Sequence, residues 1–213
     1  MTRMIFVRHG YSVANEEERF AGHSDFPLAK IGLEQAEHVA EYITKREKID
    51  KIYSSGLLRT TETVQPTADA LGLPVITDLG LREIFAGKWE GMKFVDIFEQ
   101  YRDDFSVWRN DLAHVRCTGG ESAEELFARV SDAIIRLGEE NDGKCILLAT
   151  HATPMRVVDA FASGDTYEKI AAHNAPSNAS LHIYEYANGK LTPIKTNIVE
   201  HLKGQITKLP DTV

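Results

Sequence analysis

The sequence predicts an α/β fold in three layers, an α/β/α sandwich whose mostly parallel central sheet is flanked by helices. Two observations support this prediction. Segments typical of strands alternate with segments of helical periodicity along the chain. In addition, the strand-like segments "RMIFVRH" and "KCILLATH" are continuous apolar runs. Such runs indicate strands that are covered on both faces, as in a parallel sheet between two layers of helices.

The first half of the chain contains five such elements. In order, they are a strand at 3–9, a helix at 32–47, a strand at 51–55, a helix at 57–72 and a strand at 73–78. Gly72 is expected to end the second helix. The first helix is indicated by apolar residues that recur at helical spacing, namely Leu33, Ala36, Ala40 and Ile43.

The second half adds three helices, one buried strand and a hairpin. In order, they are a helix at 94–108, a long amphipathic helix within 119–140, a strand at 144–151, a helix at 154–164 and a pair of strands at 180–197. Ser122 and Glu125 have the spacing of a capping box before the long helix. Asn188-Gly189 lies between the last two strands and predicts a tight hairpin turn.

Composition and charge limit the class of protein. The 213 residues fit a single domain, 1–213, and the net charge of −8 argues against nucleic acid or an anionic membrane as the main partner. No run of about 18 apolar residues predicts a membrane span, and the N-terminus does not resemble a signal peptide. The two cysteines, Cys117 and Cys145, fit reduced thiols in a cytoplasmic protein. The sequence leaves homodimer formation open.

Two of the predicted strands end in histidine, His9 and His151. Because the carboxyl ends of parallel strands meet at one edge of the sheet, where ligands bind, we expect the two rings to lie together. Arg8 precedes His9, and Arg59 follows another strand on the first turns of a helix. Guanidinium groups bind phosphate bidentately, and imidazole can form a covalent intermediate. This combination indicates phosphoryl transfer.

Several motifs, in their order along the chain, resemble the histidine phosphatase superfamily, which includes cofactor-dependent phosphoglycerate mutases and small-molecule phosphatases. They run from Ile5 to about Asn178 and read "VRHG", "SSGLLRTTET", "LREIFAGKWEG", "GGES" and "ATHATP", with Asn15 seven positions after Arg8. The resemblance implies the three-layer fold. It also implies a phosphatase of the histidine acid phosphatase type that requires no cofactor and no metal ion.

The resemblance also implies roles for individual residues. His9 would take the phosphoryl group, and Glu83 would protonate the leaving oxygen and then act as the base. The side chains expected to bind the phosphoryl oxygens or the substrate are Arg8, Arg59, His151, Asn15 and Ser12. As a nucleophile, His9 must be neutral, and a backbone carbonyl accepting from its other ring nitrogen would fix the required tautomer. Glu83 must be protonated when it acts as the acid.

Simpler interpretations stay open for some of these residues. Glu83 could be a solvated carboxylate, and Asn15 and Ser12 could be turn or cap residues. His23 and Asp25 lie two positions apart, but we interpret them as hydrogen-bonded turn residues rather than metal ligands. The cationic residues between Glu83 and Gly119 have no distinguishing motif, and we expect ordinary surface charges there: Lys88, Lys93, Arg102, Arg109 and Arg116.

The segment after Glu83 bears on the choice between phosphatase and mutase. The mutases have a longer insertion there, with a Leu-Asn-Lys run and an arginine pair that clamps the substrate carboxylate. This chain has neither, and we expect only a small helical cap at about 84–118. The prediction is therefore a phosphomonoester hydrolase that acts on a small phosphorylated metabolite. The alternative is a cofactor-dependent phosphoglycerate mutase, and a non-enzymatic phosphate-binding protein is disfavoured because no catalytic residue is missing.

Overall fold

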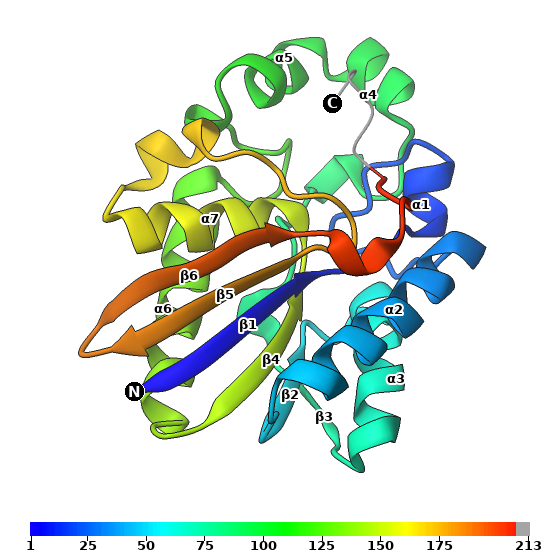
Figure 1. Cartoon of the computed structure of the whole chain (residues 1–213). Coiled ribbons are helices and arrows are strands. Elements are labelled where there is room, and N and C mark those ends of the chain that lie inside the picture. The colour runs from blue at the N-terminus through cyan, green and yellow to red at the C-terminus, as the bar shows by residue number, and fades with distance from the viewer. Residues whose placement is uncertain (208–213) are drawn as a thin grey trace.

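Residues 1–207, which the computed structural model describes, form a central sheet of six strands in the order β3-β2-β4-β1-β5-β6 (Figure 1). The strands are β1 (Thr2–Arg8), β2 (Lys51–Ser54), β3 (Val75–Thr77), β4 (Cys145–Thr150), β5 (Leu181–Ala187) and β6 (Lys190–Ile198). Strands β1 to β4 pair in parallel, whereas β5 is antiparallel to both β1 and β6. The prediction of a mostly parallel sheet is therefore confirmed.

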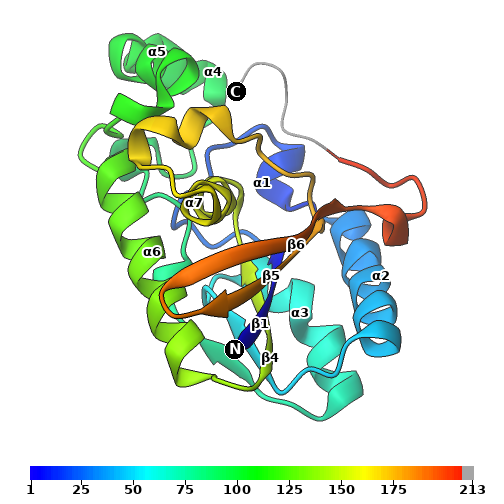
Figure 2. The ribbon, with the colours of Figure 1, turned by 60° about the vertical axis from the view of Figure 1, so that its left-hand side comes forward.

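Helices cover both faces of this sheet. The α-helices are α1 (Val13–Glu16), α2 (Lys30–Arg46), α3 (Leu58–Leu71), α4 (Phe94–Gln100), α5 (Arg102–Asn110), α6 (Ala123–Glu140) and α7 (Ala152–Ser163). Short 3-10 helices lie at η1 (Leu79–Leu81), η2 (Gly87–Trp89), η3 (Leu112–His114), η4 (Tyr167–Ala172) and η5 (Glu200–Leu202). Helices α2 and α3 pack on one face, and α6 and α7 pack on the other (Figures 1 and 2). This is the predicted three-layer sandwich.

Side chains of β1 alternate between the two cores, as the pleat of a strand requires. Met4 and Phe6 belong to the core beneath α6 and α7, whereas Ile5 and Val7 belong to the core beneath α2 and α3. All four side chains are fully buried. The continuous apolar run that predicted this strand thus reflects burial on both faces.

Helix α2 differs from its predicted pattern at Leu33. Ala36, Ala40 and Ile43 are buried as expected, but Leu33 is 50% exposed. The neighbouring Gly32 faces the protein instead, and a Cβ atom there would lie 2.1 Å from the carbonyl oxygen of Tyr11. Leu33 is about 100° further around the helix and therefore points away.

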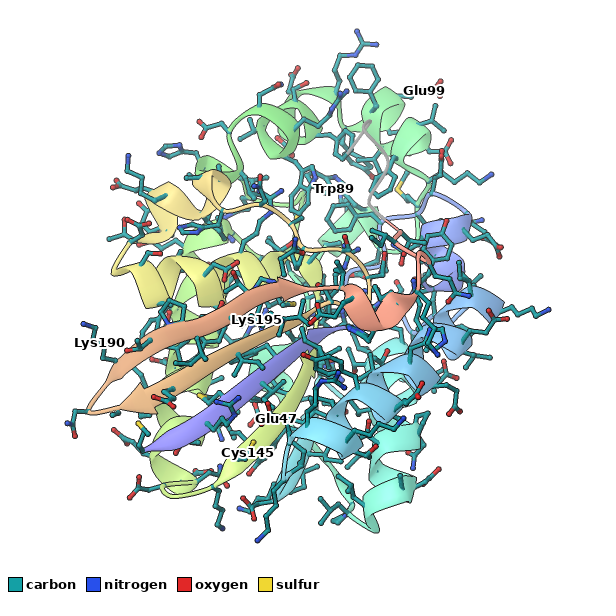
Figure 3. All side chains as sticks on the ribbon, viewed as in Figure 1. Glu47, Trp89, Glu99, Cys145, Lys190 and Lys195 are labelled. Atoms are coloured by element: carbon teal, nitrogen blue, oxygen red, sulfur yellow. The ribbon has the colours of Figure 1, made fainter. Side chains whose placement is uncertain are left out.

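The helix predicted at 94–108 is two helices, because the chain breaks at Tyr101 (φ −132°, ψ 42°). Packing between aromatic rings accounts for this break. Phe105 of α5 stacks on Phe94 of α4, with centroids 6.3 Å apart, and meets the buried Trp89 edge-on. Figure 3 shows Trp89 beneath these helices, while Glu99 points outward from α4. These helices lie in the segment predicted to form the cap, hereafter the cap (residues 84–118).

Local signals in the sequence predicted several element ends correctly. Gly72 ends α3 in the left-handed conformation, with φ 66°. Ser122 and Glu125 form the expected capping box before α6. Asn188 and Gly189 both have positive φ, as the tight turn between β5 and β6 requires. None of the helices within residues 1–207 has the length and apolarity needed to cross a membrane.

Candidate active site

Strands β1 and β4 place His9 and His151 side by side. The two strands are parallel neighbours with Arg8 opposite Thr150, and the backbone N–H of His9 donates to the Thr150 carbonyl at 2.9 Å. The next residue of each strand therefore leaves the sheet at the same edge. The centroids of the two imidazole rings lie 5.2 Å apart at an angle of 60°. Residues that are distant in sequence thus share one site.

The hydrogen bonds of His9 leave one ring nitrogen free to act as a nucleophile. Nδ1 lies 2.7 Å from the Gly10 carbonyl oxygen, so this nitrogen is the donor and Nε2 retains its lone pair. His9 is only 5% exposed. Burial, followed by the charges of Arg59 and Arg8, holds the pKa of His9 well below its ordinary value. The ring is therefore neutral, in the tautomer that nucleophilic attack requires.

Gly10, which follows His9, is required by a close approach of the backbone and not by a turn with positive φ. It is not among the glycines with positive φ. Instead, the loop passes so close to α2 that a Cβ on Gly10 would stand 2.8 Å from the carbonyl oxygen of Gly32. The backbone N–H of Gly10 donates to the Thr63 hydroxyl at 2.9 Å. Close approach between two glycines thus fixes the backbone beside His9.

His151 is held by partners on both ring nitrogens. Arg59 Nε donates to Nδ1 at 3.2 Å, so Nε2 carries the proton and donates to the Ser55 hydroxyl at 2.8 Å. Ser55 in turn contacts the Thr60 hydroxyl at 2.9 Å, and Thr60 donates to the Leu57 carbonyl. Burial, Arg59 and His9 together hold the pKa of His151 well below its ordinary value. This second imidazole is also neutral.

Two guanidinium groups lie buried beside these rings without carboxylate partners. Arg8 is 1% exposed and Arg59 is fully buried. None of the ion pairs within residues 1–207 includes either of them. Burial lowers the pKa of each guanidinium to about 10, and the charge of Glu83 opposes this change. Both groups therefore stay charged at neutral pH.

The hydrogen bonds of the two arginines are incomplete. Arg8 Nη1 donates to the Pro176 carbonyl at 2.5 Å, but its buried Nε has no hydrogen-bond partner within residues 1–207. Arg59 donates to the carbonyls of Gly22 and Ser24, which fix the direction of its side chain. Burying a cation without an anion beside it costs free energy. The arrangement is therefore suited to binding an anion.

Glu90 supports Arg59 through the loop that carries those carbonyls. Its carboxylate accepts from the backbone N–H groups of His23, Ser24 and Ala86 at 2.7 to 2.9 Å. No sequence pattern separates Glu90 from other acidic residues of the segment. Its role depends on contacts across 66 positions of sequence.

The loop after His9 orients Asn15 toward the pocket. The side-chain oxygen of Asn15 accepts from the Ser12 backbone N–H at 3.0 Å and from Asn178 Nδ2 at 3.3 Å. These bonds leave the amide N–H groups of Asn15 available to a ligand. Ser12 is fully buried and caps α1, and it is not among the residues that line the pocket. Its cap role matches the alternative kept open for it.

Glu83 is fixed by its backbone and by its carboxylate. Its carbonyl oxygen accepts from His23 Nε2 at 2.8 Å and from Arg129 Nη2 at 3.2 Å. Its carboxylate accepts from the backbone N–H of Ile84 at 2.9 Å and lies 3.4 Å from that of Thr153. His23 thus serves as a hydrogen-bonded loop residue. Within residues 1–207, no three His, Cys, Asp or Glu side chains are grouped to hold a metal ion.

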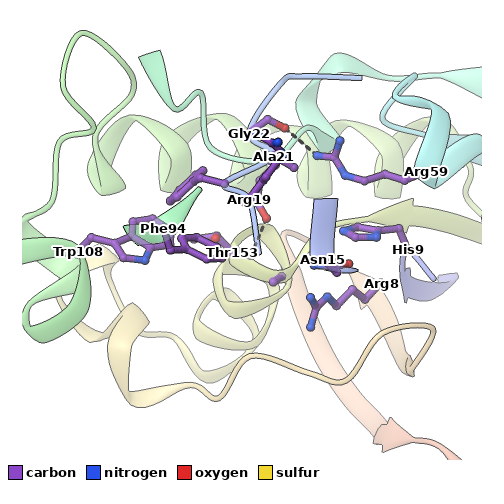
Figure 4. Close-up of a pocket in the computed structure, with 13 residues that line it drawn as sticks. Arg8, His9, Asn15, Arg19, Ala21, Gly22, Arg59, Phe94, Trp108 and Thr153 are labelled. Atoms are coloured by element: carbon purple, nitrogen blue, oxygen red, sulfur yellow. Dashed lines mark hydrogen bonds between the residues drawn. The ribbon is translucent and has the colours of Figure 1, made fainter. Parts of the chain in front are cut away.

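Some of these residues line a pocket with a polar end and an aromatic end, and His151 is not among the lining residues. Figure 4 shows Arg8, His9 and Arg59 at one end and Phe94 and Trp108 of the cap at the other. Asn15, Glu83 and Thr153 also line it. The polar end can hold an oxyanion against the His9 ring, and the aromatic end can hold the organic part of an ester.

Sequence reasoning missed Asn178. The "NAS" triplet at 178–180 matches a glycosylation pattern, but Asn178 is fully buried. Its side-chain amide donates to the carbonyl of His9 at 3.2 Å and to Asn15, and its oxygen accepts from the Thr207 hydroxyl. It therefore joins the loop after His9 to the C-terminal segment at Thr207. No local signal identifies such a contact.

The two neutral imidazoles predict a pH-dependent stability. Below a pH of about 6.5, His9 and His151 bind protons in the unfolded chain but stay neutral in the folded protein. The free energy of unfolding therefore falls as the pH falls. Each ring contributes a slope of up to about 1.4 kcal/mol per pH unit. His151→Asn should reduce the slope by up to this amount in urea unfolding between about pH 5 and pH 6.5.

A matched control for this measurement is His114→Asn. His114 is exposed, and its hydrogen bond with Asp111 raises its pKa, so its contribution has the opposite sign. Removing it should not flatten the slope. An unchanged slope in His151→Asn would show that His151 takes up its proton within the folded protein.

Comparison with known proteins identifies the family of the chain. The model of the histidine phosphatase superfamily (branch 1) matches residues 4–199. Phosphoserine phosphatase 1 of Hydrogenobacter thermophilus is 31% identical over 202 residues, 95% of this chain and 95% of the relative. Phosphoglycerate mutase-like protein 4 of Arabidopsis thaliana is 32% identical over 205 residues, 94% of this chain and 86% of the relative.

Solved structures also match this chain over most of its length. The crystal structure of the alpha-ribazole phosphatase from Shigella flexneri matches with a TM-score of 0.83 and 26% identity, over 92% of this chain and 96% of the other. The match of the family model includes His9, His151 and the whole cap. The chain belongs to the histidine phosphatase superfamily.

Proposed function

We propose that the protein hydrolyses small phosphate monoesters through a covalent phosphohistidine on His9. The observation that supports this most directly is the pair of buried, unpaired guanidinium groups beside the free Nε2 of His9. A phosphate dianion would complete the hydrogen bonds of Arg8 and neutralise both cations. The same contacts would stabilise the charge that develops during phosphoryl transfer.

In the first step, the Nε2 lone pair of His9 attacks phosphorus, and the bond between phosphorus and the ester oxygen breaks. Glu83 donates its proton to the departing oxygen, which leaves as an alcohol. Arg8, Arg59 and the Asn15 amide hold the non-bridging oxygens. His151 supports this arrangement through its hydrogen bond with Arg59 and its packing against the His9 ring. In the second step, Glu83 takes a proton from water, the water oxygen attacks phosphorus, and inorganic phosphate leaves His9.

A panel of phosphate monoesters assayed for release of inorganic phosphate tests this proposal. The relatives are named for phosphoserine and for α-ribazole, so the panel should include phosphate esters of both. The mutase alternative is tested with 3-phosphoglycerate and catalytic 2,3-bisphosphoglycerate. We expect phosphate release to be faster than isomer formation. A folded protein that releases phosphate from no ester, 4-nitrophenyl phosphate included, would refute hydrolysis.

We also expect activity to survive EDTA. Arginine side chains would supply the charge compensation that magnesium supplies in other phosphoryl-transfer enzymes. The measurement is the rate of phosphate release after dialysis against EDTA, compared with the rate after magnesium is added back. Strong inhibition by the chelator, reversed by the metal, would contradict this part of the mechanism.

A further inference from the structure

A second cavity, of about 290 Å³, adjoins the active-site pocket. The two share Trp108, Ala152 and Thr153 in their walls. The second cavity lies between the end of α5, the start of α7 and the segment around η4. Because Thr153 also lies 3.4 Å from the carboxylate of Glu83, the shared wall is next to the position of the leaving oxygen. The organic part of a bound ester would therefore extend toward this second cavity.

Two arginines line this cavity, Arg156 from α7 and Arg109 from α5. Within residues 1–207, neither side chain forms a hydrogen bond, an ion pair or a contact over an aromatic ring. Other arginines do have such partners, as in Arg116–Glu125 and Arg129–Glu121, or Arg102 over the ring of Phe98. In a chain with a net charge of −8, unpaired arginines gather at the two joined cavities.

Arg156 lies close enough to the catalytic groups for their charges to affect its pKa. Burial lowers its pKa, and the charge of Glu83 opposes this effect. The charge of Arg156 in turn contributes to lowering the pKa of Arg8. Arg156 is only partly buried, so its guanidinium can be approached from the cavity. This places a third cation a short distance beyond the phosphoryl site.

Helix α5 is held firmly enough to position Arg109. Phe105 is 1% exposed and packs against Trp89, and the ring of Trp108 meets Phe20 at a centroid distance of 4.8 Å. Asn110 donates to the carbonyl of Ser106 one turn earlier. Arg109 follows Trp108 at the rim and is exposed, so it should contribute less than Arg156.

We propose that this second cavity binds a carboxylate on the leaving group, so that the preferred substrates are phosphorylated carboxylic acids. This inference rests on the proposed function and extends it to substrate class. A guanidinium pairs with a planar carboxylate through two parallel hydrogen bonds. Arg156 supplies the main contact, and Arg109 closes the cavity from the cap.

Matched pairs of esters test the proposal. O-phosphoserine has a carboxylate that O-phosphoethanolamine lacks. In the second pair, 3-phosphoglycerate has a carboxylate where glycerol 3-phosphate has a hydroxymethyl group. The quantity measured is the ratio of kcat/KM between the members of each pair. We expect wild type to favour the carboxylated ester, and Arg156→Gln to lower the ratio at least about tenfold. Arg109→Gln should lower the ratio by about threefold, and Arg156→Lys should retain part of the preference for the carboxylated ester.

The control is Arg102→Gln, an exposed arginine of the same helix that lines neither cavity. Its ratio should match that of wild type. Equal loss of both esters in Arg156→Gln would overturn the proposal, because it would place Arg156 on the phosphoryl group. A wild-type ratio near one would also overturn it. Since Arg109 is exposed, its variant should fold even if Arg156→Gln does not.

Binding separates this proposal from the proposed hydrolysis. His9→Ala, titrated calorimetrically with both members of each pair, should bind the carboxylated ester more tightly. Introducing Arg156→Gln into that variant should remove the difference. Failure of the proposed function would appear instead as no phosphate release from 4-nitrophenyl phosphate, which carries no carboxylate.

Discussion

Alanine in place of His9 is expected to abolish turnover of every phosphate ester, by about 10⁴-fold or more. The remaining site would keep both guanidinium groups and still bind the ester. Within residues 1–207, it would lack the one imidazole nitrogen beside them that has a free lone pair and a fixed tautomer. His151 cannot replace it, because Arg59 and Ser55 occupy both of its ring nitrogens.

The direct measurement is a rapid quench of the reaction with labelled substrate into alkaline detergent, after which portions of the denatured protein are incubated in acid and in base. Wild type should yield a phosphoenzyme that is labile in acid and stable in base, and His9→Ala should yield none. His114→Ala, which removes an exposed imidazole of the cap, should retain the adduct. Recovery of the same adduct from His9→Ala would place the covalent intermediate on another residue.

Glutamine at position 83 is expected to slow esters of ordinary alcohols by about 10²- to 10⁴-fold. Their leaving oxygen needs a proton as the bond to phosphorus breaks, and glutamine cannot supply one. 4-Nitrophenyl phosphate should be affected far less, since nitrophenolate leaves without protonation. The fixed hydrogen bonds to the backbone of residue 83 should keep the amide in the same position.

The measurement is kcat/KM for a series of esters whose leaving groups differ in acidity. A steeper dependence on leaving-group acidity in Glu83→Gln than in wild type identifies the general acid. Glu124→Gln, on the exposed first turn of α6, is the control and should leave the dependence unchanged. Equal slowing of all esters in Glu83→Gln would assign the acid to a different residue.

The part of the fold that could be predicted depends on local chemistry. A continuous apolar run is sufficient to identify β1 and β4, and the two residues Asn188 and Gly189 are sufficient to identify the hairpin. The break at Tyr101 was not predictable, because it follows from the stacking of Phe94 on Phe105. Periodicity alone describes one helix there, and only tertiary contact divides it.

The same distinction between local sequence pattern and tertiary contact applies to the site. His9, His151 and Arg59 follow the ends of strands, so topology alone brings them to one edge. Asn178 and Glu90 act through hydrogen bonds to distant backbone groups, for which the sequence has no signal. Arg156 could have been found, because it lies on the first turns of the helix after His151, as Arg59 does after β2.

The two guanidinium groups without a counter-ion have a consequence for the resting enzyme. Keeping them dehydrated and uncompensated lowers the stability of the empty protein. A bound oxyanion removes this penalty, so the melting temperature should rise with the logarithm of the vanadate or phosphate concentration once that concentration exceeds the dissociation constant. Thermal denaturation thus offers a way to rank natural ligands without an assay of turnover.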